Sequence, residues 1–156
     1  METIDPIKAA NVWKRVHSPG ESDRARELLT LIAQEWTDAA TYLQLSRQIP
    51  GKDSALLRKI YEQEQSHTAC LKGIYTLLTG SRPTVRAVPA PREDVQTALR
   101  RCYGREMQCL ARYEAKSSEP EFGQVFARLA EQEQEHCHLL LEILGRLKTD
   151  KIPGNL

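Results

Sequence analysis

The sequence has few residues that break helices and few that favour strands. Its 156 residues include 8 glycines, 8 prolines and only 6% aromatic side chains. Several glycines and prolines fall in short clusters, and the segments between them are rich in Leu, Ala, Glu, Gln, Arg and Lys, which favour helix over strand. The clusters are Pro19-Gly20, Pro50-Gly51, residues 80–91 and Pro153-Gly154. The sequence therefore predicts an all-α fold.

Long apolar runs and a charge of one sign are also lacking. No stretch approaches the roughly 20 apolar residues of a membrane span, and the first residues lack the basic start and apolar stretch of a secretory signal. The 22 basic and 21 acidic side chains give a net charge of +1. Nucleic acids and anionic membranes both require a basic excess, so neither is an expected partner. A cytoplasmic location is the default expectation.

The cysteines form no C-x-x-C pair, which disfavours zinc-ribbon, rubredoxin-type and thioredoxin-type sites. We expect them to be reduced thiols that mostly pack in the interior. The four are Cys70, Cys102, Cys109 and Cys137.

Four segments carry inward stripes that step alternately by three and four residues, as one face of a helix requires. They begin near Ser22, Asp53, Arg92 and Pro120 and end near residues 49, 78, 117 and 147. Short connections follow the first and third segments, whereas residues 80–91 form a long link with three prolines. This spacing predicts an antiparallel four-helix bundle of two helical hairpins joined by a crossover.

The predicted organisation has three parts. Residues 1–21 are expected to hold a short N-terminal helix, opened by Asp5-Pro6, and a linker. Residues 22–149 form the bundle, and residues 150–156 form a C-terminal tail.

The second half of the chain repeats polar motifs of the first. The hexapeptide EQEQSH at 62–67 recurs as EQEQEH at 131–136, and a Glu-x6-Tyr pair at Glu35 recurs at Glu106. The copies lie 69 and 71 residues apart, in the same order. This pattern indicates a duplicated hairpin related by a pseudo-twofold axis.

Six polar residues interrupt the inward aliphatic stripes and are expected to point into the core. An unpaired carboxylate in a core costs several kcal/mol, so a compensating charge is required. Four carboxylates balance two divalent cations, and two imidazoles complete the coordination, which predicts a dinuclear centre. Oxygen-rich ligation with some imidazole favours iron or manganese. The six residues are Glu35, Glu64, His67, Glu106, Glu133 and His136.

Other residues near this set receive lesser roles. Tyr42 and Tyr113 each follow a ligand glutamate by two helical turns and are placed to donate hydrogen bonds to ligating carboxylates. Cys102 and Cys109 flank Glu106 on one inward face, where they either pack or lie beside the metals. Asp38 is expected to be a flanking polar residue, and three other glutamates are expected on solvated faces: Glu62, Glu131 and Glu135.

Glu35, Glu64-x-x-His67, Glu106 and Glu133-x-x-His136 on four helices resemble the ferritin-like di-iron carboxylate proteins, most closely the four-helix domain of rubrerythrins. The resemblance covers about residues 22–148. It implies that Glu64 and Glu133 bridge two metals, that Glu35 and Glu106 are terminal ligands, and that each histidine caps one metal. It also implies a homodimer.

Similar proteins reduce hydrogen peroxide or dioxygen, whereas others in the superfamily store iron or hydroxylate substrates. The resemblance implies a di-iron peroxidase or oxidase, with an iron-handling protein and a di-iron hydroxylase as the alternatives. Rubrerythrins usually carry another glutamate where this chain has Cys109, and the usual rubredoxin-like domain is missing. An external electron-donor protein is therefore expected.

Overall fold

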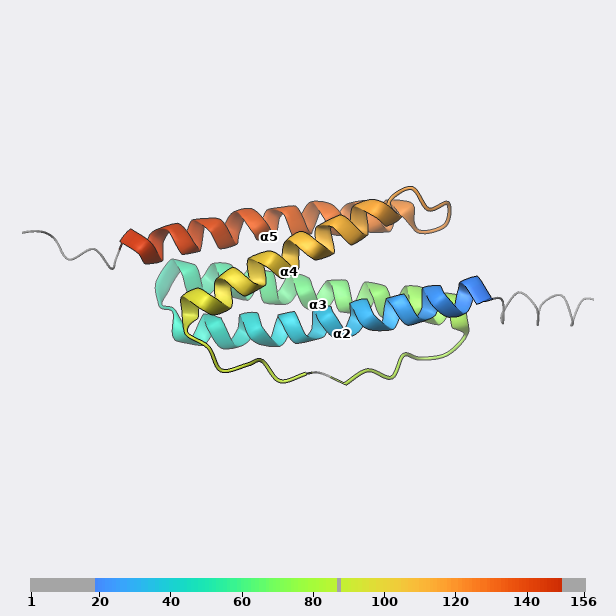
Figure 1. Cartoon of the computed structure of the whole chain (residues 1–156), viewed down its shortest axis with the longest axis horizontal. Coiled ribbons are helices and arrows are strands. Elements are labelled where there is room, and N and C mark those ends of the chain that lie inside the picture. The colour runs from blue at the N-terminus through green and yellow to red at the C-terminus, as the bar shows by residue number, and fades with distance from the viewer. Residues whose placement is uncertain (1–18, 87, 150–156) are drawn as a thin grey trace, which may run out of the picture.

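The computed structural model describes residues 19–86 and 88–149 and confirms the all-α prediction for them. No strand occurs in this part of the chain (Figure 1). The short N-terminal helix expected after Asp5-Pro6 and the tail at 150–156 lie outside the described residues. The helices are α2 Pro19–Gln48, α3 Gly51–Thr79, α4 Val95–Lys116 and α5 Gly123–Thr149.

Three helix starts lie three residues from the predicted positions, and one of them is α4, which begins at Val95 and not near Arg92. Helix α2 begins at Pro19, so Ser22 lies inside it and not at its N-cap. Proline is tolerated there because the first turn of a helix uses no N–H bonds. Helix α5 begins at Gly123 and not near Pro120. A Cβ atom at Gly123 would lie 2.4 Å from the carbonyl oxygen of Ser117, so the α4–α5 turn requires glycine at this close approach.

The ends of α3 and α4 follow familiar capping chemistry. Helix α3 ends at Thr79 and is capped by Gly80, which adopts a left-handed conformation with φ of 72° and donates its N–H to the Thr76 carbonyl at 2.8 Å. Helix α4 starts after Asp94, whose carboxylate accepts the Thr97 N–H at 3.0 Å. These caps fix where the long crossover between the hairpins begins and ends.

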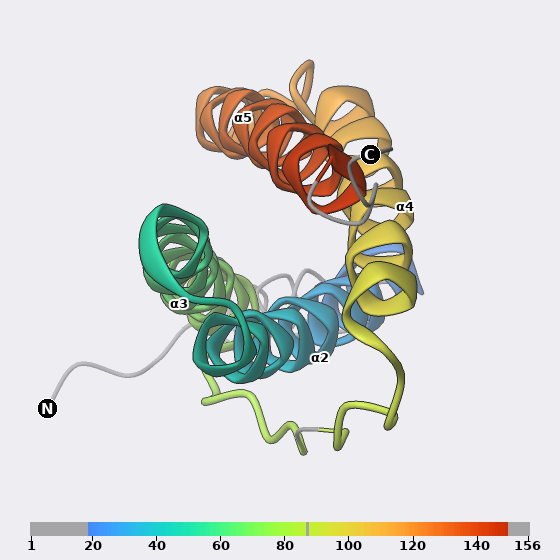
Figure 2. The ribbon, with the colours of Figure 1, turned by 90° about the vertical axis from the view of Figure 1, so that its left-hand side faces the viewer.

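The four helices form two closely packed hairpins, α2 with α3 and α4 with α5, with sparser contact between the hairpins. The crossover returns along the length of α2 (Figure 1), and Val88 donates its N–H to the hydroxyl of Thr37 at 3.4 Å. Viewed end-on, α2 lies between α3 and α4, and α5 lies across from α2 (Figure 2). Within the described residues, no helix has an apolar stretch long enough to cross a membrane.

The core consists of two apolar clusters, one towards each end of the helices. One includes Leu28, Ile32, Leu71 and Phe126, and it also contains Tyr113. The other includes Leu45, Ile60, Leu99, Leu140 and Ile143, together with Tyr42. The middle turn of each helix lies between these clusters and carries polar side chains instead. A polar site placed there has apolar packing on both sides along the bundle.

Candidate metal centre

The middle turns bring all six predicted polar residues into the interior. Each of the six residues is at most 2% exposed, so the predicted inward orientation is confirmed. The glutamates on the predicted solvated faces, Glu62, Glu131 and Glu135, are exposed, as expected. The site residues are Glu35 on α2, Glu64 and His67 on α3, Glu106 on α4, and Glu133 and His136 on α5.

These side chains form two overlapping groups, each with ligand atoms within 4.8 Å of one another. Each group contains one histidine and three glutamates. One group is Glu35, Glu64, His67 and Glu133, and the other is Glu64, Glu106, Glu133 and His136. Glu64 and Glu133 belong to both groups, so they lie between the two positions that a pair of cations would take.

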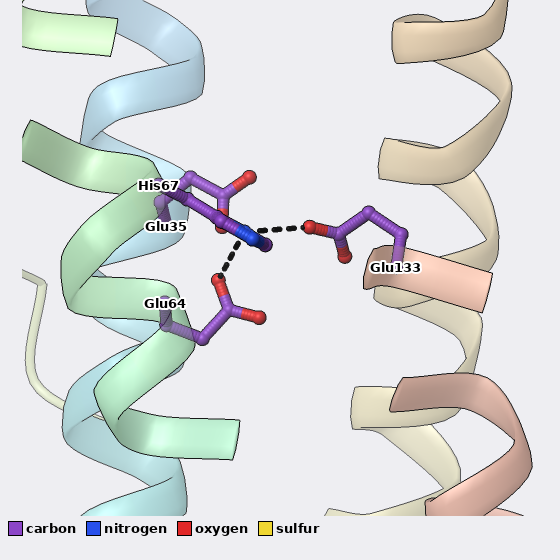
Figure 3. Close-up of side chains that lie close together, drawn as sticks. All are labelled: Glu35, Glu64, His67 and Glu133. Carbon is purple, nitrogen blue, oxygen red and sulfur yellow. Dashed lines mark ion pairs between the residues drawn. The ribbon is translucent and has the colours of Figure 1, made fainter. Parts of the chain in front are cut away.

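Both histidines turn Nδ1 toward the carboxylates. His67 Nδ1 lies 2.8 Å from Glu133 Oε1, across the gap between the hairpins (Figure 3), and 3.6 Å from oxygens of both Glu35 and Glu64. His136 Nδ1 lies 2.9 Å from Glu64 Oε1 and 3.4 Å from Glu106 Oε2. The two halves therefore repeat the same contacts, which agrees with the pseudo-twofold axis that the repeated motifs predict.

The tyrosine hydroxyls also reach across the hairpins. Tyr42 donates to Glu106, and Tyr113 donates to Glu35. Each tyrosine therefore holds the glutamate of the other hairpin, not the one that precedes it in its own helix. These bonds occupy one oxygen of each carboxylate and fix its orientation.

Two glutamines that the sequence analysis did not single out contact the outer nitrogens of the histidines. Gln132 Oε1 lies 2.7 Å from His67 Nε2, and Gln63 Oε1 lies 2.8 Å from His136 Nε2. Both glutamines are half-buried. The sequence contained a sign that these glutamines matter. Both occupy the same position of the repeated hexapeptide, directly before its second glutamate.

Beyond the histidines, the two halves are no longer alike. Gln34 donates to Cys109 Sγ at 3.2 Å, which places this thiol in the interior. At the equivalent position of the other half, Asp38 pairs with Arg105, with Oδ1 and Nε 2.6 Å apart. Asp38, which the sequence analysis expected only to flank the site as a polar residue, is 4% exposed. Its environment could not be read from the sequence because the partner arginine comes from another helix.

Burial and charge set the protonation of this cluster. Burial raises the pKa of Asp38 to about 8 despite Arg105, and the charges of Glu106 and Glu35 add to the shift. Burial likewise raises the pKa of Glu64 and of Glu133 well above 4.5, and neighbouring carboxylates raise it further.

The pKa values of Glu35 and Glu106, each of which belongs to only one ligand group, shift in the opposite direction. Burial alone would raise the pKa of Glu35, but contacts with Glu64, His67 and Tyr113 hold it below 4.5. The pKa of Glu106 is also lowered against its burial, by Glu133, His136 and Tyr42. Without a metal, the raised pKa values of the two shared glutamates oppose the build-up of negative charge in the cluster.

The donor set fits metal ions. None of the four carboxylate oxygens of Glu64 and Glu133 forms a hydrogen bond of normal geometry, although all four are buried. Their polar contacts are the approaches of the histidine Nδ1 atoms, at 2.8 Å for Glu133 and 2.9 Å for Glu64. Buried polar atoms rarely stay without hydrogen bonds, and these four oxygens, which face one another from α3 and α5, are what a cation would satisfy.

We expect metal binding to release protons. Because burial and neighbouring carboxylates raise the pKa values of Glu64 and Glu133 well above 4.5, these carboxyls keep their protons to higher pH, and a metal ion must displace them. The apparent metal affinity should therefore rise with pH, and metal binding should release protons from these two carboxyls. Titration of metal into weakly buffered protein with a pH indicator measures this release. The double variant Glu64→Gln/Glu133→Gln should release none, and a wild type that also released none would contradict this protonation state.

No family model, curated protein or solved structure matches the chain. The comparisons therefore show no family for this chain, and the resemblance to ferritin-like proteins rests on the six residues and their repeat alone. The structure itself shows a four-helix all-α fold with buried glutamate and histidine clusters that are compatible with metal.

Proposed function

We propose that this chain binds two iron ions, or two manganese ions, and reduces hydrogen peroxide or dioxygen. In this proposal Glu64 and Glu133 would be shared by the two metals, Glu35 and Glu106 would each hold one as a terminal ligand, and each histidine would bind one metal through Nδ1. The observation that carries the proposal is the pair of shared glutamates, which belong to both candidate ligand groups.

The bound metals would supply the electron transfer, and the chain supplies the environment. The apolar clusters at both ends of the site limit water, which strengthens each electrostatic interaction within it. The hydroxyls of Tyr42 and Tyr113 keep Glu106 and Glu35 oriented. Reduction of one hydrogen peroxide to two waters consumes two electrons and two protons, and the electrons come from an external donor protein.

Two other functions of the same site compete with this proposal. An iron-handling protein would bind the same metals without catalytic turnover. A hydroxylase would need space for an organic substrate beside the metals. Two surface cavities, of about 480 and 570 Å³, include residues such as Trp36, Tyr61, Leu77 and Pro83, but none of the six site residues. They give no support to hydroxylation.

The first test is metal content per chain by elemental analysis of protein purified without oxygen, with the absorption spectrum followed after peroxide is added. About two irons, with peroxide consumed faster than by an equal amount of free iron, would support the proposal. Two manganese ions would redirect it to catalase-like chemistry. Bound iron without turnover would favour iron handling, and absence of metal after reconstitution would overturn the proposal.

Oligomeric state separates storage from the proposed enzyme. Storage of ferritin type requires a large shell, whereas the proposed enzyme is a homodimer. Sedimentation of the purified protein distinguishes these, and a mass far above that of a dimer would favour storage.

A further inference from the structure

The outer nitrogens of the two site histidines are held across the hairpins. Gln132 on α5 contacts His67 on α3 at 2.7 Å, and Gln63 on α3 contacts His136 on α5 at 2.8 Å. The imidazoles are at most 1% exposed, whereas both glutamines are half-buried. Each glutamine therefore lies between a buried ring and the outside of the bundle.

The contact constrains the ring proton. An amide oxygen only accepts hydrogen bonds, so Nε2 must donate, and a neutral imidazole has one N–H. Nδ1 is then left with a free lone pair that points at the carboxylates. The opposite arrangement, with the amide nitrogen donating to Nε2, would place the ring proton on Nδ1 and fill the position that a metal must take.

We propose that Gln63 and Gln132 are positioning residues that make Nδ1 of His136 and of His67 the metal-binding nitrogen. This inference rests on the proposed metal site. The outer hydrogen-bond partner of a ligating histidine sets its tautomer and ring orientation. Because each glutamine comes from the other hairpin, the histidines are oriented only once the hairpins have docked.

The repeated hexapeptide contains its own controls. Gln65 and Gln134 lie two residues after Gln63 and Gln132, on the same helices, but both are exposed. A glutamine-to-leucine change at either exposed position alters helix propensity and side-chain size in the same way without touching a histidine.

The test measures binding of Mn(II) and Zn(II) to the full chain. Gln63→Leu and Gln132→Leu should each weaken binding about 10–100-fold, as is typical when the outer partner of a metal ligand is lost. The exposed controls Gln65→Leu and Gln134→Leu should bind as the wild type does. Gln63→Glu and Gln132→Glu keep an accepting oxygen and should retain tight binding, which separates the loss of the acceptor from misfolding.

A second readout locates the ring protons directly. Nitrogen NMR of the zinc-loaded wild type should show both site histidines protonated at Nε2 and metal-bound at Nδ1. Protons on Nδ1, or equal metal affinity in the leucine variants and their exposed controls, would overturn the inference while leaving the metal site intact. A wild type that binds neither ion would instead overturn the proposed metal site itself.

Discussion

Replacing Glu64 with alanine is expected to remove both metal ions, whereas replacing Glu35 is expected to remove mainly one. Glu64 belongs to both ligand groups and Glu35 to only one. The loss for Glu64→Ala should exceed about 100-fold in affinity, since even the outer partners of ligands account for 10–100-fold. Elemental analysis after anaerobic reconstitution gives the number of ions per chain for each variant.

Because of the pseudo-twofold arrangement, each of these variants has an equivalent in the other half of the chain. Glu133→Ala should repeat the result of Glu64→Ala, and Glu106→Ala that of Glu35→Ala. Glu62→Ala, which alters an exposed glutamate two residues from Glu64, should keep full metal content. Equal metal content in Glu64→Ala and Glu35→Ala would contradict the bridging role, and circular dichroism confirms that the variants fold.

Metal loading is expected to raise the melting temperature strongly. A ligand that binds only the folded chain at about 1,000 times its Kd stabilises it by about 4 kcal/mol. For a chain of this length each kcal/mol shifts the melting temperature by roughly 2–4 °C, so a rise of about 8–16 °C is expected. Thermal unfolding followed by circular dichroism, with and without metal under anaerobic conditions, measures the shift.

The variant Glu64→Gln/Glu133→Gln should lose this shift and yet be more stable than the metal-free wild type at higher pH. The raised pKa values of Glu64 and Glu133 mean that the folded chain holds protons there that the unfolded chain releases above about pH 4.5. These two residues therefore make the free energy of unfolding fall as pH rises, and neutral amides remove that fall. A metal-induced shift that persisted in the variant would place the binding site elsewhere.

Much of the fold and the inner site follows from local pattern. The 3–4 spacing of apolar residues predicts which face of each helix is buried, and it places Glu35 and His136 on that face beside residues such as Ile32 and Leu140. All of these residues are buried. The apolar periodicity predicts the buried face correctly because side chains return to the same face of a helix every 3.6 residues, and this holds for any partner helix.

What the sequence left open depends on contacts between helices. Tyr42 was expected to bond a ligand carboxylate, but only the packing of α2 against α4 shows that this carboxylate is Glu106. Likewise, Gln63 looks like any polar residue beside a glutamate until α5 brings His136 to it. The pairing of Asp38 with Arg105 has no local signature at all, because 67 residues separate the two.

The exchange of contacts between the hairpins has an evolutionary consequence. Neither hairpin alone supplies a complete ligand group, since His67 needs Glu133 and His136 needs Glu64. A half-length ancestor with a single Glu-x-x-His helix would have formed the same centre only as a symmetric pair of identical chains. Gene duplication and fusion would then have freed the outer positions to diverge, which accounts for Cys109 facing Gln34 in one half and Asp38 facing Arg105 in the other.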